Sequence, residues 1–424
     1  MKLLLLSVWL GVAAAPAWAQ APTITVAAEL GGVFDALAAA YPGEAPQRSA
    51  GEADLVLAPG RASWDEVRTV VPVPDVTLRA RTDDAEAAAF LRFARSPDAQ
   101  AALIEGGFLP AEVSVSDQAG RTVRVPQPVR RIASPYGLST YLVYAVGAGD
   151  RLVTAGYLGA RDPQGAAAME RIDPDFPEVS AAAPADTTNV EFLATLAPDL
   201  VASSARAEWI PSAQALGMPV LAFDGESPDA LADAMRMTGR ALGPDAAARA
   251  DAWVRYYRDV LARVARATEQ GRAAPRVLFT GTDPSRVASG QMYQTDLIQA
   301  AGGVSVTAGL RGHWAEVGLE QVLAWNPELI LVPPYGGASV AAITNDPSWQ
   351  LLPAVREGRV LRVPKLVAPW DTPVPDSVLA VVWLAEVLHP DATDLSCAEE
   401  ARFFYRRFYD YALTSDEVTS LCRR

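Results

Sequence analysis

The sequence predicts an α/β protein whose main body has two similar lobes with parallel sheets, preceded by a small N-terminal α/β unit. Three observations favour this fold: a motif that occurs twice, alternating strand and helix patterns, and one long amphipathic helix. The chain has 424 residues, and half of them are apolar. That is enough material for more than one hydrophobic core.

The motif that occurs twice has a glutamate at the start of an apolar-periodic run, then a proline and a second apolar run. Its copies are residues 189–201, with Glu191, and residues 318–330, with Glu320. A glutamate is favourable at a helix N-terminus because its charge meets the positive end of the helix dipole. The proline ends the helix, and the apolar residues after it predict a buried strand. Each copy should form a helix, a turn and a parallel strand, although the pattern is also a general helix-to-strand connector.

Residues 1–19 predict a cleaved signal peptide. Lys2 precedes an apolar run that ends at Ala15, and the small residues Ala17 and Ala19 provide a cleavage site before Gln20. The run is shorter than the ~20 residues that span a bilayer. No cysteine stands directly after the cleavage site to carry a lipid anchor, so we expect the periplasm of a Gram-negative cell.

Residues 20–112 predict the small N-terminal unit. Its expected elements are strand 23–28, helix 32–41, strand 54–58 and helix 83–105, with Gly106 and Gly107 as a stop. Stretches 23–37, 53–58 and 90–110 resemble the start, middle and end of molybdate-type binding proteins, without the chain that builds their second lobe. The resemblance implies a single remnant lobe that does not enclose a ligand by itself. It is either an accessory module or a functionally silent insertion.

The main body shows its organisation in its periodicity. Strand and helix patterns alternate from Arg131 to Phe223, which predicts a parallel sheet with helices on both faces. A helical stretch then carries an apolar stripe that includes Trp253 and Tyr257, and alternation resumes at Arg276. The predicted boundaries are 113–243 for the first lobe, 244–272 for the linking helix and 273–424 for the second lobe.

Four stretches of the main body carry further motifs, at 115–135, 290–303, 314–320 and 358–364. In this order and approximate spacing they resemble class III periplasmic substrate-binding proteins, which serve ABC importers of iron-siderophores, haem and cobalamin. The resemblance covers the chain from about Ser116 to the C-terminus. It implies two Rossmann-like lobes joined by a rigid backbone helix, with modest closure of the cleft. It also implies a monomeric carrier, without catalysis or cofactor, that delivers a metal chelate to an ABC permease dimer in the inner membrane.

The ligand of such a protein is expected between the lobes, at the loops that leave the carboxyl ends of the strands. Aromatic residues recur in these loops, and their large stiff surfaces suit a flat chelate or macrocycle. Arginines there, including Arg286 and Arg311, would neutralise an anionic chelate or face solvent. The predicted ligand-binding residues are Ser134, Tyr136, Tyr157, Ser203, Arg206, Tyr293, Trp314, Tyr335 and Trp370. Of these, Tyr136, Tyr157, Trp314 and Trp370 match, loop for loop, ligand-contacting positions of the resembled cobalamin-binding relatives.

The two glutamates of the repeated motif gain a role from the resemblance. In the resembled family, a carboxylate at the apex of each lobe docks against arginines of the permease dimer, and Glu191 and Glu320 occupy those motif positions. Exposed ion pairs contribute only about 0 to 1 kcal/mol each. They would therefore set register and encounter rate more than affinity. Helix capping is the other role open to both residues.

Molybdate or tungstate is the alternative ligand, because some class III proteins bind these oxyanions. A tetrahedral dianion needs backbone amides, hydroxyls and an arginine. The hydroxyls would come from Ser134, Tyr136, Ser203 and Ser204.

The composition argues against several other classes. A bare zinc or manganese site needs several imidazoles and carboxylates, and the chain has two histidines. We expect His389 to be an exposed helix cap and His313 to stand alone in its loop, so no metal ligands are predicted. A hydrolase is a remote alternative: Ser134 and Ser289 lie in loops of the cleft, but there is no Gly-x-Ser-x-Gly elbow. The net charge of −14 argues against nucleic acid as a partner.

The chain has two cysteines, Cys397 and Cys422, which flank an aromatic-rich helical pattern and a short second helix. Two antiparallel helices would bring them together, and an exported chain meets an oxidising compartment. We predict one disulfide that closes the tail, with two buried free thiols as the alternative.

Overall fold

The computed structural model describes residues 21–61, 68–156, 163–181, 189–268, 274–335, 339–390 and 396–423. The chain divides into two compact units, the first ending at Leu109 and the second starting at Pro110 within this description. The predicted signal peptide and Tyr157 lie outside the described residues. Within these ranges, no helix has both the length and the apolar character needed to cross a membrane.

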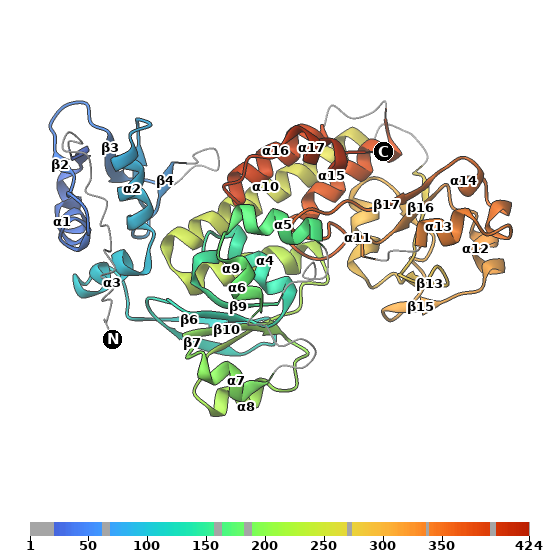
Figure 1. Ribbon diagram of the computed structural model, residues 1–424, viewed down its shortest axis with the longest axis horizontal. Helices are drawn as coiled ribbons and strands as arrows, with labels where there is room; N and C mark the ends of the chain where they lie inside the picture. Colours follow the sequence, from blue (N-terminus) through green and yellow to red (C-terminus); the bar gives the residue numbers. More distant parts are fainter. Residues whose placement is uncertain are drawn as a thin grey trace, which may run out of the picture. The chain divides into compact units, whose positions relative to one another are not determined.

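The N-terminal unit, blue in Figure 1, contains a five-stranded mixed sheet in the order β2-β1-β3-β5-β4. Strand β1 pairs parallel with β2 and β3, whereas β5 pairs antiparallel with β3 and β4. The strands are β1 (Thr23–Val26), β2 (Gln47–Arg48), β3 (Leu55–Pro59), β4 (Thr69–Val70) and β5 (Val76–Ala80). The unit has its own hydrophobic core, which includes Ile24, Leu55 and Phe90. Strands β2, β4 and β5 were not among the predicted elements.

The helices of this unit correct one prediction. The single helix expected at 83–105 is two helices, α2 (Ala85–Ala94) and α3 (Pro97–Glu105), after the predicted first helix α1 (Gly31–Ala40). The break falls at Ser96, whose hydroxyl accepts a hydrogen bond from the amide of Ala99 at 3.3 Å. A proline at the first helical position favours a new start and disfavours helical backbone at the residue before it. The predicted stop after Glu105 is confirmed, and Gly107 has a positive φ of 75°.

The first lobe of the second unit begins with an antiparallel hairpin, β6 (Glu112–Ser116) and β7 (Thr122–Pro126). Its main sheet has four parallel strands in the order β11-β10-β8-β9. These are β8 (Ile132–Ser134), β9 (Leu152–Ala155), β10 (Leu200–Ser204) and β11 (Val220–Phe223). The helices are α4 (Gly137–Ala145), α5 (Pro163–Ile172), α6 (Phe176–Ala181), α7 (Val190–Thr195), α8 (Ile210–Ala215) and α9 (Pro228–Leu242). The predicted alternation of strands and helices is therefore confirmed.

The second lobe repeats this plan. Its parallel sheet has the order β14-β12-β16-β17, and β13 pairs antiparallel with β15 beside it. The strands are β12 (Arg276–Phe279), β13 (Arg286–Ala288), β14 (Val304–Ser305), β15 (Trp314–Glu316), β16 (Leu329–Val332) and β17 (Val360–Arg362). The helices are α11 (Tyr293–Ala300), α12 (Leu319–Trp325), α13 (Ser339–Thr344), α14 (Pro353–Arg356) and α15 (Ser377–Leu388).

Both copies of the repeated motif form the expected helix, turn and parallel strand, as α7 with β10 and α12 with β16. The turns also share one backbone feature. The residue directly before each proline has a positive φ, 44° at Ala197 and 47° at Asn326. The duplication therefore extends from the sequence to the conformation of the turn.

Helix α10 (Pro244–Thr268) is the predicted link between the lobes. Its length corresponds to about 38 Å at 1.5 Å per residue. Its apolar stripe is buried, with Trp253 and Tyr257 stacked at 4.8 Å between ring centroids. One continuous hydrophobic core contains residues of both lobes and of the helices between them, for example Ile132, Val277 and Val382. A shared core resists large hinge motion, which supports the expectation of modest lobe movement.

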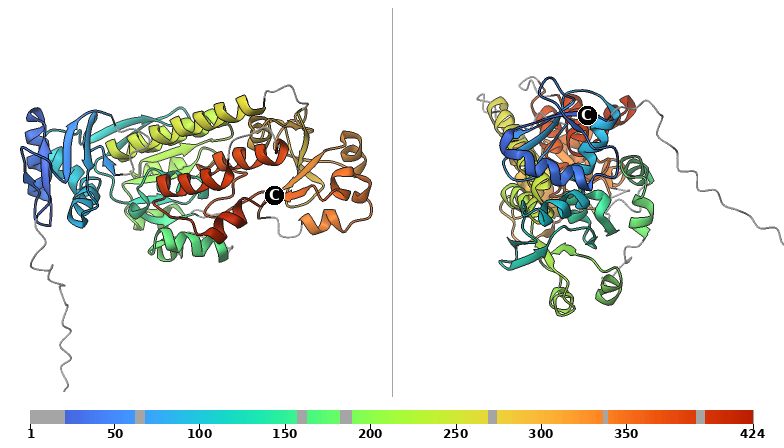
Figure 2. Two further views of the ribbon diagram at one scale, coloured as in Figure 1. Left: turned by 90° about the horizontal axis from the view of Figure 1, so that it is seen from above. Right: turned by 90° about the vertical axis from the view of Figure 1, so that its left-hand side faces the viewer.

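The chain ends in a helical tail, α16 (Cys397–Phe408) and α17 (Ser415–Leu421), shown with α10 and α15 in Figure 2. A disulfide joins Cys397 and Cys422, as predicted. The tail reaches the first lobe, where Arg171 of α5 donates to the Tyr411 hydroxyl at 2.8 Å and pairs with Glu417. The disulfide therefore links the two ends of the tail, and polar contacts hold the tail against the first lobe.

His389 corrects a second prediction. It follows α15 as expected, but its side chain is buried, and its Nε2 lies 3.1 Å from the carbonyl oxygen of Gly302. A Cβ at Gly302 would lie 2.8 Å from this nitrogen. The His389 ring fits there because Gly302, which it contacts, has no side chain.

Candidate functional site

Each parallel sheet of the second unit has a topological switch point between its two central strands. In the first lobe, the central strands β8 and β10 are followed along the chain by β9 and β11, which lie at opposite edges of the sheet. In the second lobe, the central strands are β12 and β16, and the edge strands are β14 and β17. Open α/β sheets bind ligands outside the carboxyl ends of strands at such switch points. The residues that follow β8, β10, β12 and β16 therefore define the candidate site.

A polar cluster lies at this edge of the first lobe. The guanidinium of Arg206, which follows β10, places Nη2 3.2 Å from Asp224 Oδ1 and 3.4 Å from Glu226 Oε1, and its side chain is 53% exposed. Tyr136, which precedes α4, belongs to the same cluster. Burial raises the pKa of Tyr136 to about 12, and the negative charge of Glu226 adds to this. The sequence prediction included Tyr136 and Arg206 but missed the two acids, although Asp224 directly follows strand β11 and Glu226 lies two residues further on.

Arg206 also contacts the second lobe. Its Nη1 lies 3.0 Å from Nε2 of His313, in the loop that leads into β15. Because arginine stays protonated, this Nε2 acts as the acceptor, which places the imidazole proton on Nδ1. His313 was expected to stand alone in its loop, so the contact is a correction. It also shows that the carboxyl edge of the first sheet faces the second lobe.

On the second lobe, Trp314 lies against the end of β12. Its ring atoms are 3.4 Å from the position that a Cβ would take at Gly281, and its ring centroid is 6.5 Å from that of Phe279. Backbone contacts hold the preceding loop, since Ser289 donates its amide to the His313 carbonyl at 3.1 Å. Trp314 is partly exposed, so part of its ring surface is available to a ligand.

Tyr335 follows β16 and is 44% exposed. Its hydroxyl donates to Oδ2 of Asp371 at 2.9 Å, and Asp371 is completely buried. The hydroxyl is thus the inner end of this side chain.

The structure buries four of the predicted ligand-binding residues. Tyr293 is 1% exposed, and its hydroxyl is 2.6 Å from Ser377 Oγ and 3.1 Å from the Tyr257 hydroxyl. Trp370 is fully buried in the core that the lobes share. Ser134 and Ser203 are also buried. All four lie in the packed interior in this structure, whereas Tyr136, Arg206, Trp314 and Tyr335 are at least partly exposed at the sheet ends.

The Ser134 hydroxyl already has partners in its own lobe. It bonds Ser139 Oγ at 2.8 Å and Thr140 Oγ1 at 2.9 Å, which ties β8 to α4. Arg286 and Arg311 are exposed. In the part of the chain that the structure describes, no group of three or more histidine, cysteine or acidic side chains could hold a metal ion.

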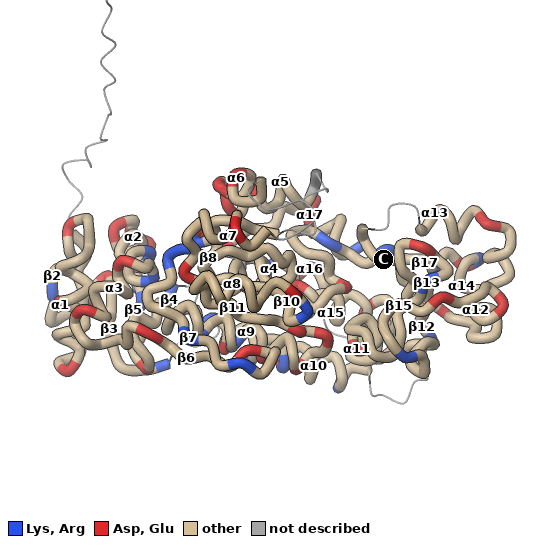
Figure 3. The backbone as a smooth tube through the Cα atoms, turned by 90° about the horizontal axis from the view of Figure 1, so that it is seen from below, with Lys and Arg blue, Asp and Glu red and all other residues tan. Residues whose placement is uncertain are grey.

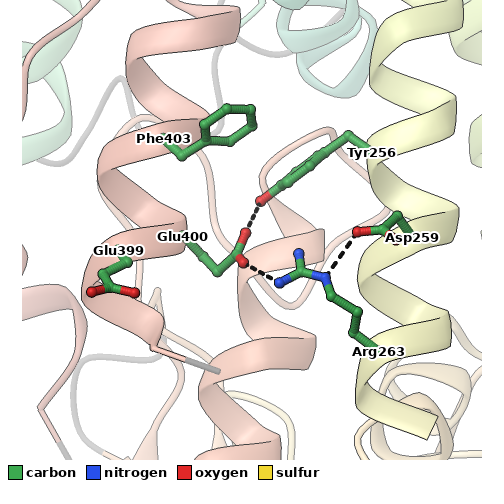
Figure 4. A pocket seen from close by; sticks show the side chains of 6 residues that line it. All are labelled: Tyr256, Asp259, Arg263, Glu399, Glu400 and Phe403. Atoms are coloured by element: carbon green, nitrogen blue, oxygen red, sulfur yellow. Dashed lines mark hydrogen bonds and ion pairs between the residues drawn. The ribbon is translucent and has the colours of Figure 1, made fainter. Parts of the chain in front are cut away.

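A pocket of about 370 Å³ lies elsewhere, between α10 and α16 (Figure 4). Glu400 is its central polar group and accepts hydrogen bonds from the Tyr256 hydroxyl at 2.8 Å and from Arg263 Nη1 at 2.6 Å. Arg263 also pairs with Asp259 at 2.8 Å. These charges satisfy one another and fasten the tail to the linking helix, so we assign the network a structural role.

Glu191 and Glu320 are both exposed, in the first turns of α7 and α12, and Figure 3 shows acidic positions on both helices. The cap of α7 is Asn189, whose side chain accepts from the Phe192 amide at 2.9 Å. Glu191 is therefore not needed as the cap. At α12 the N-cap residue is Gly318, and no side chain makes a capping hydrogen bond there. The Glu320 carboxylate folds back to 2.9 Å from the position that a Cβ would take at Gly318.

Comparisons with known proteins identify the family of the second unit. Residues 132–366 match the family described as periplasmic binding protein. The molybdate-binding protein MolA of Haemophilus influenzae is 24% identical over 332 residues, covering 73% of this chain and 94% of MolA. The vitamin B12-binding protein of Yersinia pestis is 27% identical over 217 residues, covering 49% of this chain and 70% of that protein.

Solved structures share the fold of the second unit. A periplasmic solute binding protein from Veillonella parvula has a TM-score of 0.64 at 24% identity, covering 73% of this chain and 96% of that chain. The family match begins at residue 132, after the N-terminal unit, and spans more than half of the chain. The chain belongs to the periplasmic binding protein family.

Proposed function

We propose that this protein is a monomeric periplasmic substrate-binding component of an ABC importer, and that it carries a metal chelate of the ferric-siderophore, haem or cobalamin type. The observation that carries the proposal is the contact between Arg206 and His313, which brings the two lobes together at the carboxyl ends of their strands. A ligand held there would touch both lobes.

The chemistry of the exposed side chains favours a chelate. Tyr136 and Trp314 offer aromatic surface with polar edges, and Tyr335 adds aromatic surface, which suits a flat, partly apolar ligand. Arg206 provides a positive charge for a carboxylate or other anionic group of the chelate. The site thus combines apolar contact area with one charge, as small-molecule carriers commonly do.

The hydrogen-bond partners of Ser134 and Ser289 favour a carrier without catalysis over a hydrolase. Ser289 is buried and its hydroxyl donates to the Gly312 carbonyl, while Ser134 bonds to two hydroxyls of its own lobe. His313 and His389 contact Arg206 and Gly302 instead. These partners favour structural roles for both serines.

Molybdate or tungstate is the second candidate, favoured by the similarity to MolA. Arg206, the Tyr136 hydroxyl and the N-terminal amides of α4 could receive a tetrahedral dianion. The burial of Ser134 and Ser203 removes two hydroxyls that this alternative would have used.

Isothermal calorimetry on the mature protein tests the ligand class. We expect binding heat with one of ferric catecholate, hemin or cyanocobalamin, and none with molybdate. Arg206→Ala should weaken binding of an anionic chelate about tenfold or more, because a charge-assisted hydrogen bond is lost. Arg240→Ala, at an exposed position on α9, is the matched control. If only molybdate gives binding heat, the oxyanion is the ligand and the chelate proposal is wrong.

Charge reversal at both apex glutamates tests docking to the permease. With Glu191→Arg and Glu320→Arg together, uptake by cells should fall at least about tenfold, since like charges placed opposite one another cost several kcal/mol. Ligand affinity in solution should stay unchanged. The control reverses one exposed glutamate of each lobe away from these helices, Glu178 and Glu357. Unchanged uptake would refute docking, and loss of folding would show a structural role for these helix N-termini instead.

A further inference from the structure

Tyr335 has an unusual orientation for a half-exposed tyrosine. Such a residue normally points its hydroxyl to water and packs its ring inward. Here the hydroxyl donates to Oδ2 of the fully buried Asp371 at 2.9 Å, although the residue as a whole is 44% exposed. The residue lies three positions after the end of β16, near the switch point of the second sheet.

Asp371 is enclosed by polar groups from several elements. Gln294 of α11 donates its Nε2 to the Asp371 carbonyl oxygen at 3.0 Å, and Lys365, which follows β17, is the nearby positive charge. Among the described residues, Asp371 Oδ1 and Gln294 Oε1 are buried acceptors without a donor. One carboxylate oxygen is therefore committed to Tyr335 and the other is free to take a proton.

We propose that Asp371 is a positioning residue for the ligand: as a carboxylate it holds Tyr335 with its ring face towards the site, and protonation weakens this hold. The proposal rests on the proposed function, because it treats the exposed ring as part of the chelate site. Asp371 itself need not touch the ligand.

The expected pH range follows from the surroundings of Asp371. Burial raises the pKa of this carboxyl to about 6, against the lowering effect of its hydrogen bond with Tyr335. Burial and then the charge of Asp371 raise the pKa of Tyr335, so the phenol remains the donor throughout. A carboxylate accepts a stronger hydrogen bond than a neutral acid does. Tyr335 is thus held more firmly above about pH 6 than below it.

Affinity for a planar ligand should rise with pH through this range. Weakening one hydrogen bond by protonation corresponds to about a three- to tenfold change in the dissociation constant. His313, Asp224 and Glu226 are further ionisable groups near the site, in contact with Arg206. Variants of Asp371 are therefore needed to separate its contribution.

Cyanocobalamin is a suitable probe because its own charge is nearly constant between pH 5 and 8. Its dissociation constant would be measured over this range for wild type, Asp371→Asn and Tyr335→Phe. Both variants should bind with the weaker, acid-form affinity at all pH values. Asp376→Asn is the matched control: Asp376 is equally buried, with a pKa also raised by burial to about 6, but it bonds Tyr405 and Tyr409 in the tail. It should keep the wild-type pH profile.

A measurement without ligand keeps this proposal separate from the proposed function. With ¹³Cζ-labelled tyrosine, the Tyr335 resonance, assigned from Tyr335→Phe, should titrate near pH 6 in wild type and in Asp376→Asn, but not in Asp371→Asn. A Tyr335 resonance that does not titrate would overturn the positioning role. If the Tyr335 resonance titrates but no chelate binds, Asp371 still controls the position of Tyr335, and the proposed chelate ligand is wrong. A wild-type pH profile of binding in Asp371→Asn would also overturn the proposal.

Discussion

Removal of the Cys397–Cys422 disulfide is expected to lower the free energy of unfolding of the second unit by roughly 3 kcal/mol. The bond closes a loop with a sequence separation of 25 around α16 and α17. Without it the unfolded chain gains conformational freedom, while the folded tail keeps its other contacts. These include the hydrogen bond between Arg171 and Tyr411. The measurement is urea unfolding of the Cys397→Ser/Cys422→Ser variant against wild type.

The N-terminal unit provides an internal control for this experiment. It has its own core and does not contain the disulfide, so its unfolding transition should not move. Reduction of the wild-type protein should reproduce the effect of the double variant. If the transition of the second unit shifted by less than about 0.5 kcal/mol, the noncovalent contacts would be sufficient to hold the tail.

The second large effect is a pH-dependent contribution of Asp376 to stability. Asp376 is fully buried at the start of α15 and accepts hydrogen bonds from Tyr405 at 2.7 Å and Tyr409 at 2.5 Å. Burial raises its pKa to about 6, and these hydrogen bonds only partly oppose the rise. The folded protein therefore holds a proton that the unfolded chain releases between about pH 4 and 6. Stability is greatest below this range and falls by about 3 kcal/mol as the pH rises through it.

Asp376→Asn should remove this loss, because the amide stays neutral at every pH. The difference in unfolding free energy between variant and wild type, measured at pH 4, 5, 6 and 7.5, isolates Asp376 from other groups. Asp371, whose pKa is raised in the same way, would continue to titrate in the variant. Asp229→Asn, at an exposed position on α9, should leave the pH dependence as in wild type. A constant difference across the range would contradict the burial argument.

The positions of many main elements were predictable because their signals are local. Helix α10 has a continuous apolar stripe, and the repeated motif predicts α7 with β10 and α12 with β16 from a glutamate, a proline and an apolar run. The error at 83–105 is also local in origin. Its apolar period continues through Ser96 and Pro97, so the periodicity alone hides the cap and the proline that begin a new helix.

The candidate site was only partly predictable. The rule that ligands bind at the carboxyl ends of strands selected Tyr136, Arg206, Trp314 and Tyr335, which are exposed to different degrees at those ends. The same rule also selected Tyr293, which the structure buries. A loop position indicates which edge of the sheet a residue is near, but it does not indicate whether another helix covers the side chain.

By itself, the sequence determined the α/β class, the duplicated lobes, the long linking helix and the pair of cysteines that close the tail. These features depend on spacing along the chain, which is visible in the residues. The tertiary structure alone decided that Arg206 meets His313 across the lobes, that His389 is buried, and that Tyr335 turns its hydroxyl inward to Asp371. Each of these depends on burial and on contacts between segments far apart in the chain, which no local pattern records.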